Sequence, residues 1–460
     1  MRSLFLFILL LYFFASCTKF VKVPNPPNQI VRSDVFSSEA TATSAVLGIY
    51  SSMAGDITMA SVSTSLLPGL SSDELTAYAG SGSLEEFYTN SINPSNSSLS
   101  QYWGNAYQYI YGANSIIEGL TNNNSINVSA RNQLTGEAKF IRAFCYFYLA
   151  NLFGDVPLIL STDYNQNAVA HRTARKLVFD QIEQDLSDAV NEMSDQYLSA
   201  DNTPTSERAR PNKWAATAML ARVDLFNGNW DAAISNSTAI IDQSGIYGLV
   251  YNLDSVFLAN SNEAIWQLIP PVTARIDTWE AEVYILFGAP SGSYGVSLSD
   301  KLVESFEPGD ARRIHWIDSI SVAGFKYYYA YKYKVSIRDL TIEYYMILRL
   351  SEQYLIRAEA RARAGDLSGA LSDLNIIRSK AGLPNSTASD LNSVLGAIQS
   401  ERRFELFTEW GHRWLDLKRT GTADAVLGPV KTGWNATDTL YPIPQIEMQN
   451  DPYLTQNPNY

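Results

Sequence analysis

The chain has 460 residues, with 34 Lys and Arg against 47 Asp and Glu, giving a formal net charge of −13 at pH 7. A strongly acidic chain without a basic stripe disfavours contact with phosphate backbones, so nucleic acid is not an expected partner. Aromatic residues make up 12% and include 27 tyrosines. Tyrosine and tryptophan combine an apolar ring with a polar edge, which is typical of ligand-binding surfaces.

Residues 1–16 have the layout of a secretory signal peptide. Arg2 precedes an unbroken apolar run from Leu4 to Phe14, and small residues stand immediately before Cys17. A cysteine at this position can be lipidated on its thiol and acylated on its amine after cleavage. The sequence therefore predicts lipidation at Cys17. The alternative is a buried N-terminal helix, and the run is too short to span a bilayer.

The segment after Cys17 is polar and rich in proline, which predicts a semi-extended tether over residues 17–28. Residues 29–460 are long enough for a large core, and we expect them to form a single domain. No later stretch is apolar and uncharged for long enough to be a transmembrane helix. The protein is thus expected to be anchored to the membrane without spanning it.

Helical periodicity dominates the middle of the chain. From Asn132 onward, apolar residues recur every three or four positions until Gly154 and Pro157 end the pattern. Cys145 lies within this helix, and we expect it to be a small buried side chain. A second helix follows at about Leu177 to Met193.

Two later segments share one register of small residues. When Gly228 is aligned with Gly365, Ala221 falls on Ala358, and Ala233 falls on Ala370. Small residues at these positions allow two antiparallel helices to approach closely, which resembles a tetratricopeptide hairpin. The alternative is an ordinary helical hairpin. We expect a mostly α-helical frame over about 130–245 and 345–420.

Two segments differ from this frame. Residues 70–105 are rich in Ser, Gly, Asn and Tyr, and residues 262–345 carry short alternating runs between Pro and Gly. These patterns predict long irregular loops and a few short strands. Binding residues usually lie on such insertions, so we expect the ligand there.

The catalytic inventory is small. The three histidines are far apart, and no His-Glu-x-x-His, phosphate-loop or nucleophile-elbow motif occurs. We therefore predict no catalytic residue, no metal ligand and no cofactor. A pair of carboxylates for glycoside hydrolysis needs no fixed spacing, so a hydrolase stays open as an alternative.

Residues 400–421 combine an apolar stripe with charges four residues apart. Leu406, Trp410 and Trp414 belong to the stripe, and Glu409 with Arg413 has the spacing of a helical ion pair. The same spacing relates His412 to Asp416. We interpret this segment as helix packing rather than catalysis.

The order of motifs along the chain resembles the SusD/RagB family of nutrient-binding outer-membrane lipoproteins. The matching stretches include the cysteine at 17 and, after it, Ser72 to Leu75, Trp103 to Asn114, Glu137 to Ala143, Phe153 to Pro157, Asn262 to Trp266, Phe306 to Arg312, Tyr354 to Ala360, Glu401 to Arg419, Tyr441 to Pro444 and Gln456 to Tyr460. One departure is the sequence Thr18-Lys19-Phe20, which lacks the acidic cluster that often marks surface export.

The resemblance implies a SusD-like frame of tetratricopeptide-like hairpins that is not an enzyme. It also implies a position at the cell outer membrane, facing the exterior, as a lid over a SusC-like TonB-dependent transporter. Members bind glycans, or in some branches peptides, and pass them inward. The family motifs are mostly packing positions, so they assign no binding role here.

Candidate ligand contacts follow from sugar chemistry, because a sugar ring presents an apolar face and a polar rim. Flat aromatic side chains with polar neighbours suit such a ring. The candidates in the two insertions are Trp279, Tyr284, Tyr78, Tyr88, Phe287, Tyr294 and Arg275. An oligosaccharide or polysaccharide is the expected ligand. A peptide ligand and a scaffold that binds only proteins are the alternatives.

Overall fold

The computed structural model describes residues 32–271, 277–336 and 341–460. The predicted signal peptide, Cys17, the tether and Arg275 lie outside the described residues. Within the three described ranges, every helix is too short or too polar to cross a bilayer.

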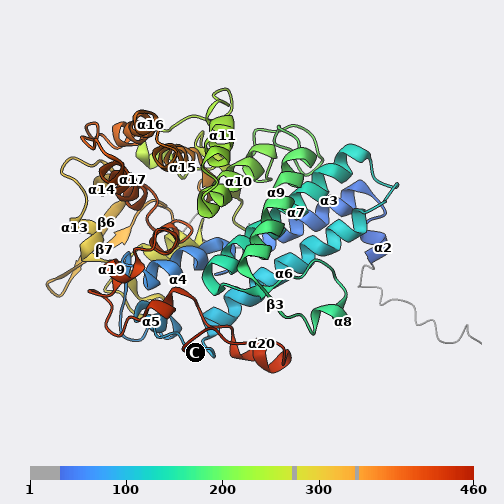
Figure 1. The fold of residues 1–460 in the computed structure, drawn as a ribbon, viewed down its shortest axis with the longest axis horizontal. Helices are drawn as coiled ribbons and strands as arrows, with labels where there is room; N and C mark the ends of the chain where they lie inside the picture. Colours follow the sequence, from blue (N-terminus) through green and yellow to red (C-terminus); the bar gives the residue numbers. More distant parts are fainter. Residues whose placement is uncertain (1–31, 272–276, 337–340) are drawn as a thin grey trace, which may run out of the picture.

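Helices that pack one against the next form the frame of the molecule (Figure 1). The helices are α3 (Glu39–Met53), α6 (Ser97–Leu120), α7 (Val128–Phe153), α9 (Arg175–Glu192), α10 (Lys213–Asn227), α11 (Trp230–Ile241), α15 (Leu350–Arg363), α16 (Leu367–Lys380) and α17 (Leu391–Glu405). Each helix of the frame contacts the next one along the chain, from α3 near the N-terminus to α17 in the C-terminal half. The expectation of a mostly α-helical fold is confirmed.

Helix α7 lies at the centre of the frame and contacts α6 and α9 along its length. Its end at Phe153 matches the predicted stop before Gly154. Nearly all its residues after Gly136 are buried, and Cys145 is among them. The cysteine is therefore a core residue, as its apolar neighbours predicted.

Both predicted hairpins are present, as α10 with α11 and as α15 with α16. The aligned alanines are completely buried at Ala221, Ala233, Ala358 and Ala370. Helix α11 packs along α15, so the hairpins are neighbours in space although more than 100 residues of chain lie between them. Ala360 of α15 lies in the small apolar cluster that joins them.

The prediction for residues 400–421 is wrong in one respect, because the segment is not a continuous helix. Helix α17 ends at Glu405 and α18 (His412–Arg419) begins after a tight turn. In this turn Gly411 has φ +65°, and a Cβ there would meet Pro68 at 2.8 Å. The turn separates Glu409 from Arg413, so the expected ion pair does not form.

The side chains of Arg413, Asp416 and His412 each face a different partner. Arg413 donates to Asp73 at 2.7 Å, and Asp416 accepts from Arg402 at 2.7 Å. His412 lies 3.8 Å from Glu352. The predicted His412–Asp416 pair is therefore also absent from the described contacts, because each side chain faces a different neighbour.

The strands form small antiparallel pairs at one end of the molecule and along the core. The pairs are β1 (Leu75–Ala77) with β5 (Val296–Leu298), β2 (Val156–Pro157) with β3 (Arg172–Thr173), β4 (Ala264–Leu268) with β8 (Tyr345–Arg349), and β6 (Ile317–Val322) with β7 (Phe325–Ala330). The predicted loop over 70–105 needs correction, because α6 starts at Ser97 with Asn96 as its N-cap.

Short helical segments complete the chain between these elements. They are α2 (Arg32–Val35), η2 (Met59–Ser63), α4 (Thr64–Ser71), α5 (Ser83–Tyr88), α8 (Tyr164–Asn167), η3 (Leu253–Ser255), α12 (Trp279–Tyr284), η4 (Gly292–Tyr294), α13 (Asp300–Glu304), α14 (Arg312–His315), α19 (Ala423–Leu427), η5 (Ala436–Thr439) and α20 (Gln445–Asn450). Several of them lie in the two insertions, where the sequence predicted irregular structure.

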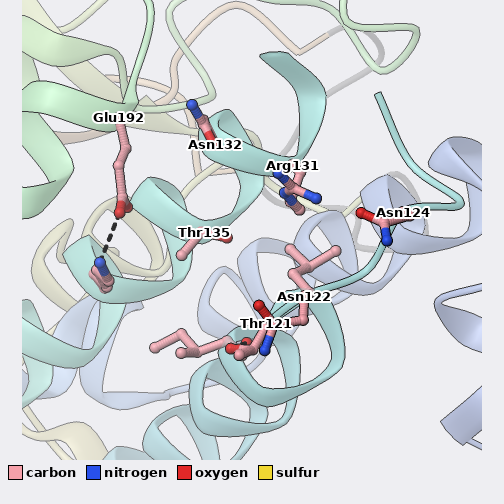
Figure 2. A pocket seen from close by; sticks show the side chains of 10 residues that line it. Thr121, Asn122, Asn124, Arg131, Asn132, Thr135 and Glu192 are labelled. Carbon is pink, nitrogen blue, oxygen red and sulfur yellow. Dashed lines mark hydrogen bonds and ion pairs between the residues drawn. The ribbon is translucent and has the colours of Figure 1, made fainter. Parts of the chain in front are cut away.

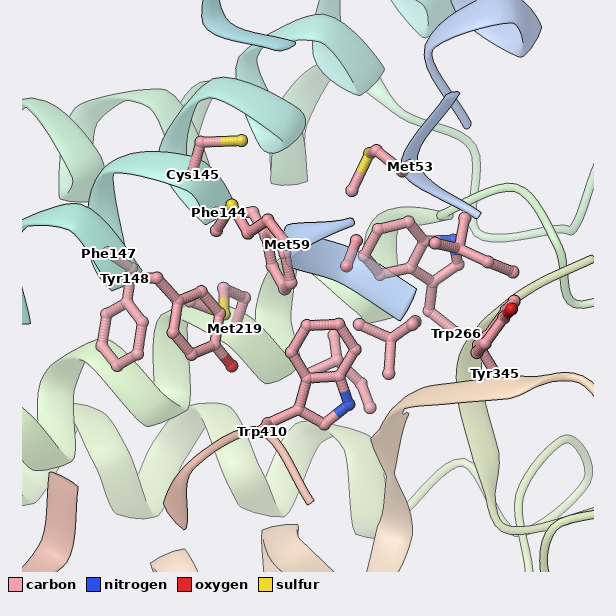
Figure 3. Close-up of a cluster of buried hydrophobic side chains, with 14 of the residues drawn as sticks. Met53, Met59, Phe144, Cys145, Phe147, Tyr148, Met219, Trp266, Tyr345 and Trp410 are labelled. Atoms are coloured by element: carbon pink, nitrogen blue, oxygen red, sulfur yellow. The ribbon is translucent and has the colours of Figure 1, made fainter. Parts of the chain in front are cut away.

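An aromatic core joins the helices to strand β4 and to the C-terminal turn (Figure 3). Phe144 of α7 lies edge-on to Trp266 of β4, with 5.6 Å between ring centroids, and to Trp410 at 5.3 Å. Edge-to-face contacts of this kind add about 0.5–1.5 kcal/mol beyond burial of the rings. The core therefore fixes the frame from which the two insertions project.

Candidate functional site

The two insertions meet in the β1–β5 strand pair. Leu75 pairs with Leu298 and Ala77 pairs with Val296, so residues more than 200 positions apart share one ladder. Strand β7 packs beside β5. The segments predicted to lie on the ligand side are thus joined to each other at one end of the molecule (Figure 1).

Tyr78 follows β1 directly and is held in place by β5. Its backbone N–H donates to the carbonyl of Gly295 at 3.0 Å, and its hydroxyl lies 2.9 Å from the hydroxyl of Ser297. The ring packs edge-on against Tyr327 of β7, with centroids 5.5 Å apart and an interplanar angle of 76°. Tyr78 is half-buried, and burial raises the pKa of its hydroxyl.

Exposed aromatic rings lie on the two segments that contact Tyr78. Tyr294 is 41% exposed and immediately precedes Gly295, while Phe325 is 67% exposed at the tip of the β6–β7 hairpin. Phe325 and Tyr327 point to the same face of the hairpin, because alternate side chains of a strand share a face. We call Tyr78, Tyr294, Phe325 and Tyr327 the aromatic platform.

Sequence reasoning missed Phe325 and Tyr327. A signal was available, because Ala323-Gly324 precedes the aromatic run Phe-Lys-Tyr-Tyr-Tyr. Ala323 has φ +53° and Gly324 has φ +86°, the conformation of a two-residue hairpin turn. A hairpin predicted at this turn would have placed alternate aromatic residues on one face.

Tyr88 lines a small cavity next to β1. It lies on α5, and the cavity has a volume of about 140 Å³. The ammonium group of Lys431 is 4.3 Å from the centroid of the Tyr88 ring and donates to the backbone carbonyl of Tyr88 at 2.7 Å. Burial lowers the pKa of Lys431 to about 7. Tyr88 is half-buried, with part of its ring at the surface.

The residues of α12 face in different directions. Trp279 is partly buried, and its indole N–H donates to Asp56 at 3.2 Å. Tyr284 is only 4% exposed, and its hydroxyl has no hydrogen-bond partner among the described residues. A ligand at the surface cannot stack on this ring. Phe287, just beyond the helix, is 76% exposed.

Another pocket, lined mainly by polar side chains, has a different character (Figure 2). It has a volume of about 410 Å³ and lies between the end of α6 and the start of α7. Its lining includes Asn122, Asn124 and Arg131, and no aromatic ring among the described residues. Glu192 there already accepts from Lys139 at 2.7 Å. The pocket lacks a flat apolar surface for a sugar ring.

Metal ligands do not gather in the described part of the chain. No three His, Cys, Asp or Glu side chains there lie close enough to hold a metal ion. His412 is buried, and burial together with the nearby Arg222 holds its pKa well below the ordinary value. The buried imidazole is therefore neutral at pH 7.

Two family models match the chain. One is described as starch-binding and associating with the outer membrane, and it matches residues 19–225. The other is described as the SusD family and matches residues 317–460. The chain belongs to the SusD/RagB family.

Individual relatives agree with the SusD/RagB assignment over nearly the whole chain. A SusD-like protein of Formosa agariphila is 27% identical over 99% of this chain and 99% of its own length. A crystal structure of a SusD superfamily protein from Bacteroides vulgatus covers 92% of this chain and 100% of its own, with a TM-score of 0.80 at 20% identity. A laminarin-binding SusD-like protein covers 91% and 99%, with a TM-score of 0.75 at 26% identity.

Two acidic residues of the SusD/RagB motifs recognised in the sequence occupy buried positions of the frame. Glu137 is fully buried, accepts from Arg210 at 2.6 Å, and accepts from the hydroxyl of Tyr50 at 2.8 Å. Glu405 is fully buried and accepts from Arg349 at 2.6 Å. The expectation that these motifs serve packing is confirmed for both residues.

Proposed function

We propose that this SusD/RagB protein is a lipid-anchored outer-membrane protein that binds a glycan on the aromatic platform. It then delivers the glycan to a SusC-like TonB-dependent transporter, and it performs no chemistry on it. Lipidation at Cys17 provides the anchor. Family membership and the resemblance to a laminarin-binding protein support this function.

The platform is the observation that carries the proposal. Tyr78 comes from the first insertion and contacts Tyr327 from the second, next to the β1–β5 pair. Tyr294 and Phe325 are exposed on the same two segments of the second insertion. A sugar ring placed on such faces gains about 0.5–1.5 kcal/mol per stack beyond burial. A few stacks and hydrogen bonds give affinities between about millimolar and micromolar. Weak binding allows the glycan to be released to a transporter.

The proposed contacts differ in part from the predicted set. Tyr78 and Tyr294 remain central, and Phe325 and Tyr327 join them. Trp279, Tyr88, Phe287 and Arg275 remain predicted contacts, and Arg275 lies outside the described residues. Tyr284 is not proposed, because its ring is buried.

Calorimetry of the full-length protein in detergent tests the proposal. The probes are laminarin, amylopectin, xylan, mannan and a set of oligopeptides. For the best-binding glycan, we expect Tyr294→Ala and Phe325→Ala each to weaken binding about two- to tenfold. Tyr251→Ala is the matched control, because Tyr251 is 64% exposed but belongs neither to the two insertions nor to the platform.

Other outcomes would contradict specific parts of the proposal. Binding of peptides but of no glycan would move the protein to the peptide-binding branch. If Tyr294→Ala, Phe325→Ala and Tyr251→Ala all bind the glycan as tightly as the wild type, the platform is not the binding site. New reducing ends during incubation with the best glycan would indicate a hydrolase.

A further inference from the structure

A second cavity lies away from the aromatic platform, between α6, the segment around residues 157–170, and α20. It has a volume of about 350 Å³, within the usual range for sites that bind small molecules. We call it the α6–α20 pocket. In Figure 1, α20 and α8 lie together on the lower side of the molecule, whereas β6 and β7 lie at its left edge.

One wall of the pocket is aromatic. Trp103, Tyr107 and Tyr111 line it and are spaced four residues apart on α6, so they share one face of the helix. The rings of Trp103 and Tyr107 are 4.9 Å apart, and the Tyr107 hydroxyl donates to the carbonyl of Pro157 at 2.8 Å. Tyr111 is 56% exposed. At one end of this wall the rings of Trp103 and Tyr107 are held by contacts within the protein, and at the other end the ring of Tyr111 is exposed to solvent.

The opposite wall supplies hydrogen-bond acceptors. Glu447 and Asn450 of α20 and Asn167 of α8 line the pocket. Glu447 is partly buried, and its carboxyl has neither a hydrogen bond nor an ion pair among the described residues. Burial raises the pKa of Glu447. The carboxylate oxygens of Glu447 are not fully buried, so water reaches them in the free protein, and a hydroxyl of a ligand in the pocket can take the place of that water.

We propose that the α6–α20 pocket is a second carbohydrate-binding site, which takes an uncharged sugar unit of the polymer held by the platform. The apolar face of the sugar stacks on Tyr111 and Tyr107, and a ring hydroxyl donates to Glu447. No Lys or Arg lines the pocket within the described residues, which disfavours an anionic ligand. This inference rests on the proposed glycan-binding function.

Two sites on one chain have a measurable consequence for long glycans. When the platform holds one part of a polymer, the pocket meets another part at a high effective concentration. The polymer then binds more tightly than a short oligosaccharide, although each site alone is weak. A short oligosaccharide instead occupies the two sites independently.

Calorimetry with laminarin and laminarihexaose, and with the matched polymer and hexasaccharide of amylopectin, xylan and mannan, tests the inference. We expect two hexasaccharides per chain in the wild type and one in Tyr111→Ala. Affinity for the polymer should fall about tenfold or more in Tyr111→Ala, and Glu447→Gln should weaken the same site. Tyr164→Ala is the matched control, because Tyr164 is 75% exposed on α8 but does not line the pocket.

The outcomes separate this inference from the proposed function. One hexasaccharide per wild-type chain, bound more weakly by Tyr294→Ala and Phe325→Ala but unchanged in Tyr111→Ala, would overturn the second site and leave the platform intact. Two sites reduced to one by Tyr111→Ala would support the pocket even if the platform variants had no effect. A basic peptide that binds the wild type but not Glu447→Gln, with a single hexasaccharide site, would assign the pocket to a cationic side chain and overturn the inference. No binding of any glycan would overturn both.

Discussion

Glu409 lies between two buried cations in the turn before α18. It accepts from Arg349 at 2.8 Å and from Lys332 at 2.5 Å. Burial by itself would raise the pKa of Glu409, but the positive charges of Arg349 and Lys332 outweigh it and hold the pKa below its ordinary value. The carboxylate of Glu409 is therefore ionised, and its negative charge compensates the positive charges of the two buried cations.

Glu409→Gln should destabilise the protein strongly, because it leaves two buried cations without that compensation. We expect a loss of about 3 kcal/mol in the free energy of unfolding, as for other broken buried pairs. The measurement is the midpoint of urea unfolding. The slope of the free energy of unfolding against urea concentration should stay unchanged.

Asp180→Asn is the control for this variant. It breaks the Lys176–Asp180 pair, whose side chains are 82% and 50% exposed. An exposed pair contributes little, so we expect a change within about 0.5 kcal/mol. Similar midpoints for the two variants would contradict the role assigned to Glu409.

At the same scale, the sequence could name candidate aromatic residues but not the direction in which each points. Trp279 and Tyr284 are five positions apart on α12, and a helix turns about 100° per residue. They therefore lie on nearly opposite sides of the helix, one toward the surface and one in the core. The short segment Trp-Glu-Ala-Glu-Val-Tyr has no periodicity that distinguishes these sides.

At the scale of elements, the close packing of α10, α11 and α15 depends on small side chains. Ala360 is fully buried in the cluster that contains Ala221 and Ala233. Ala360→Leu adds three carbon atoms at this contact. We expect it to lower the free energy of unfolding by about 1–3 kcal/mol, because neighbouring side chains must leave their preferred rotamers. Thermal unfolding measures the effect.

Ala364→Leu is the matched control, because Ala364 is exposed at the end of the same helix. The same atoms are added there without crowding, so the melting temperature should change little. An equal loss in both variants would show that helix propensity, rather than packing between the hairpins, limits the size of residue 360.

The sequence predicted best those elements whose apolar residues recur at helical spacing over many turns. The apolar repeat through α7 identified its face and its end because both are local properties. The turn at residues 406–411 could not be predicted in this way, because Trp410 packs on Phe144 and Gly411 fits closely against Pro68. Those partners are hundreds of residues away in sequence.

At the scale of the whole molecule, buried polar contacts join the first insertion to the C-terminal segment. Asp73 accepts from Arg403 at 2.9 Å and from Arg413 at 2.7 Å. Its neighbour Glu74 accepts from the backbone N–H of Thr408 at 3.4 Å, and its other carboxyl oxygen has no partner among the described residues. The position of β1, and with it Tyr78, depends on this junction.

The junction should make the stability of the molecule depend on pH. Burial, followed by the negative charge of Asp73, raises the pKa of Glu74 from 4.5 to about 8. The folded protein thus binds more protons at this group than the unfolded chain between these two values. Stability from Glu74 is complete below pH 4.5 and is lost as the pH rises toward and through 8, by at most about 1.4 kcal/mol per pH unit.

Glu74→Gln should remove this dependence, because the amide has nearly the shape of the protonated acid and does not titrate. We expect its advantage over the wild type in the free energy of unfolding to grow steadily between about pH 5 and pH 8 and then to level off. Urea unfolding at intervals of one pH unit measures the difference, and Glu85→Gln reports the effect of removing an exposed carboxyl. Parallel profiles for Glu74→Gln and the wild type would mean that Glu74 is already ionised in the folded protein, because only a proton held at the junction makes the two profiles diverge.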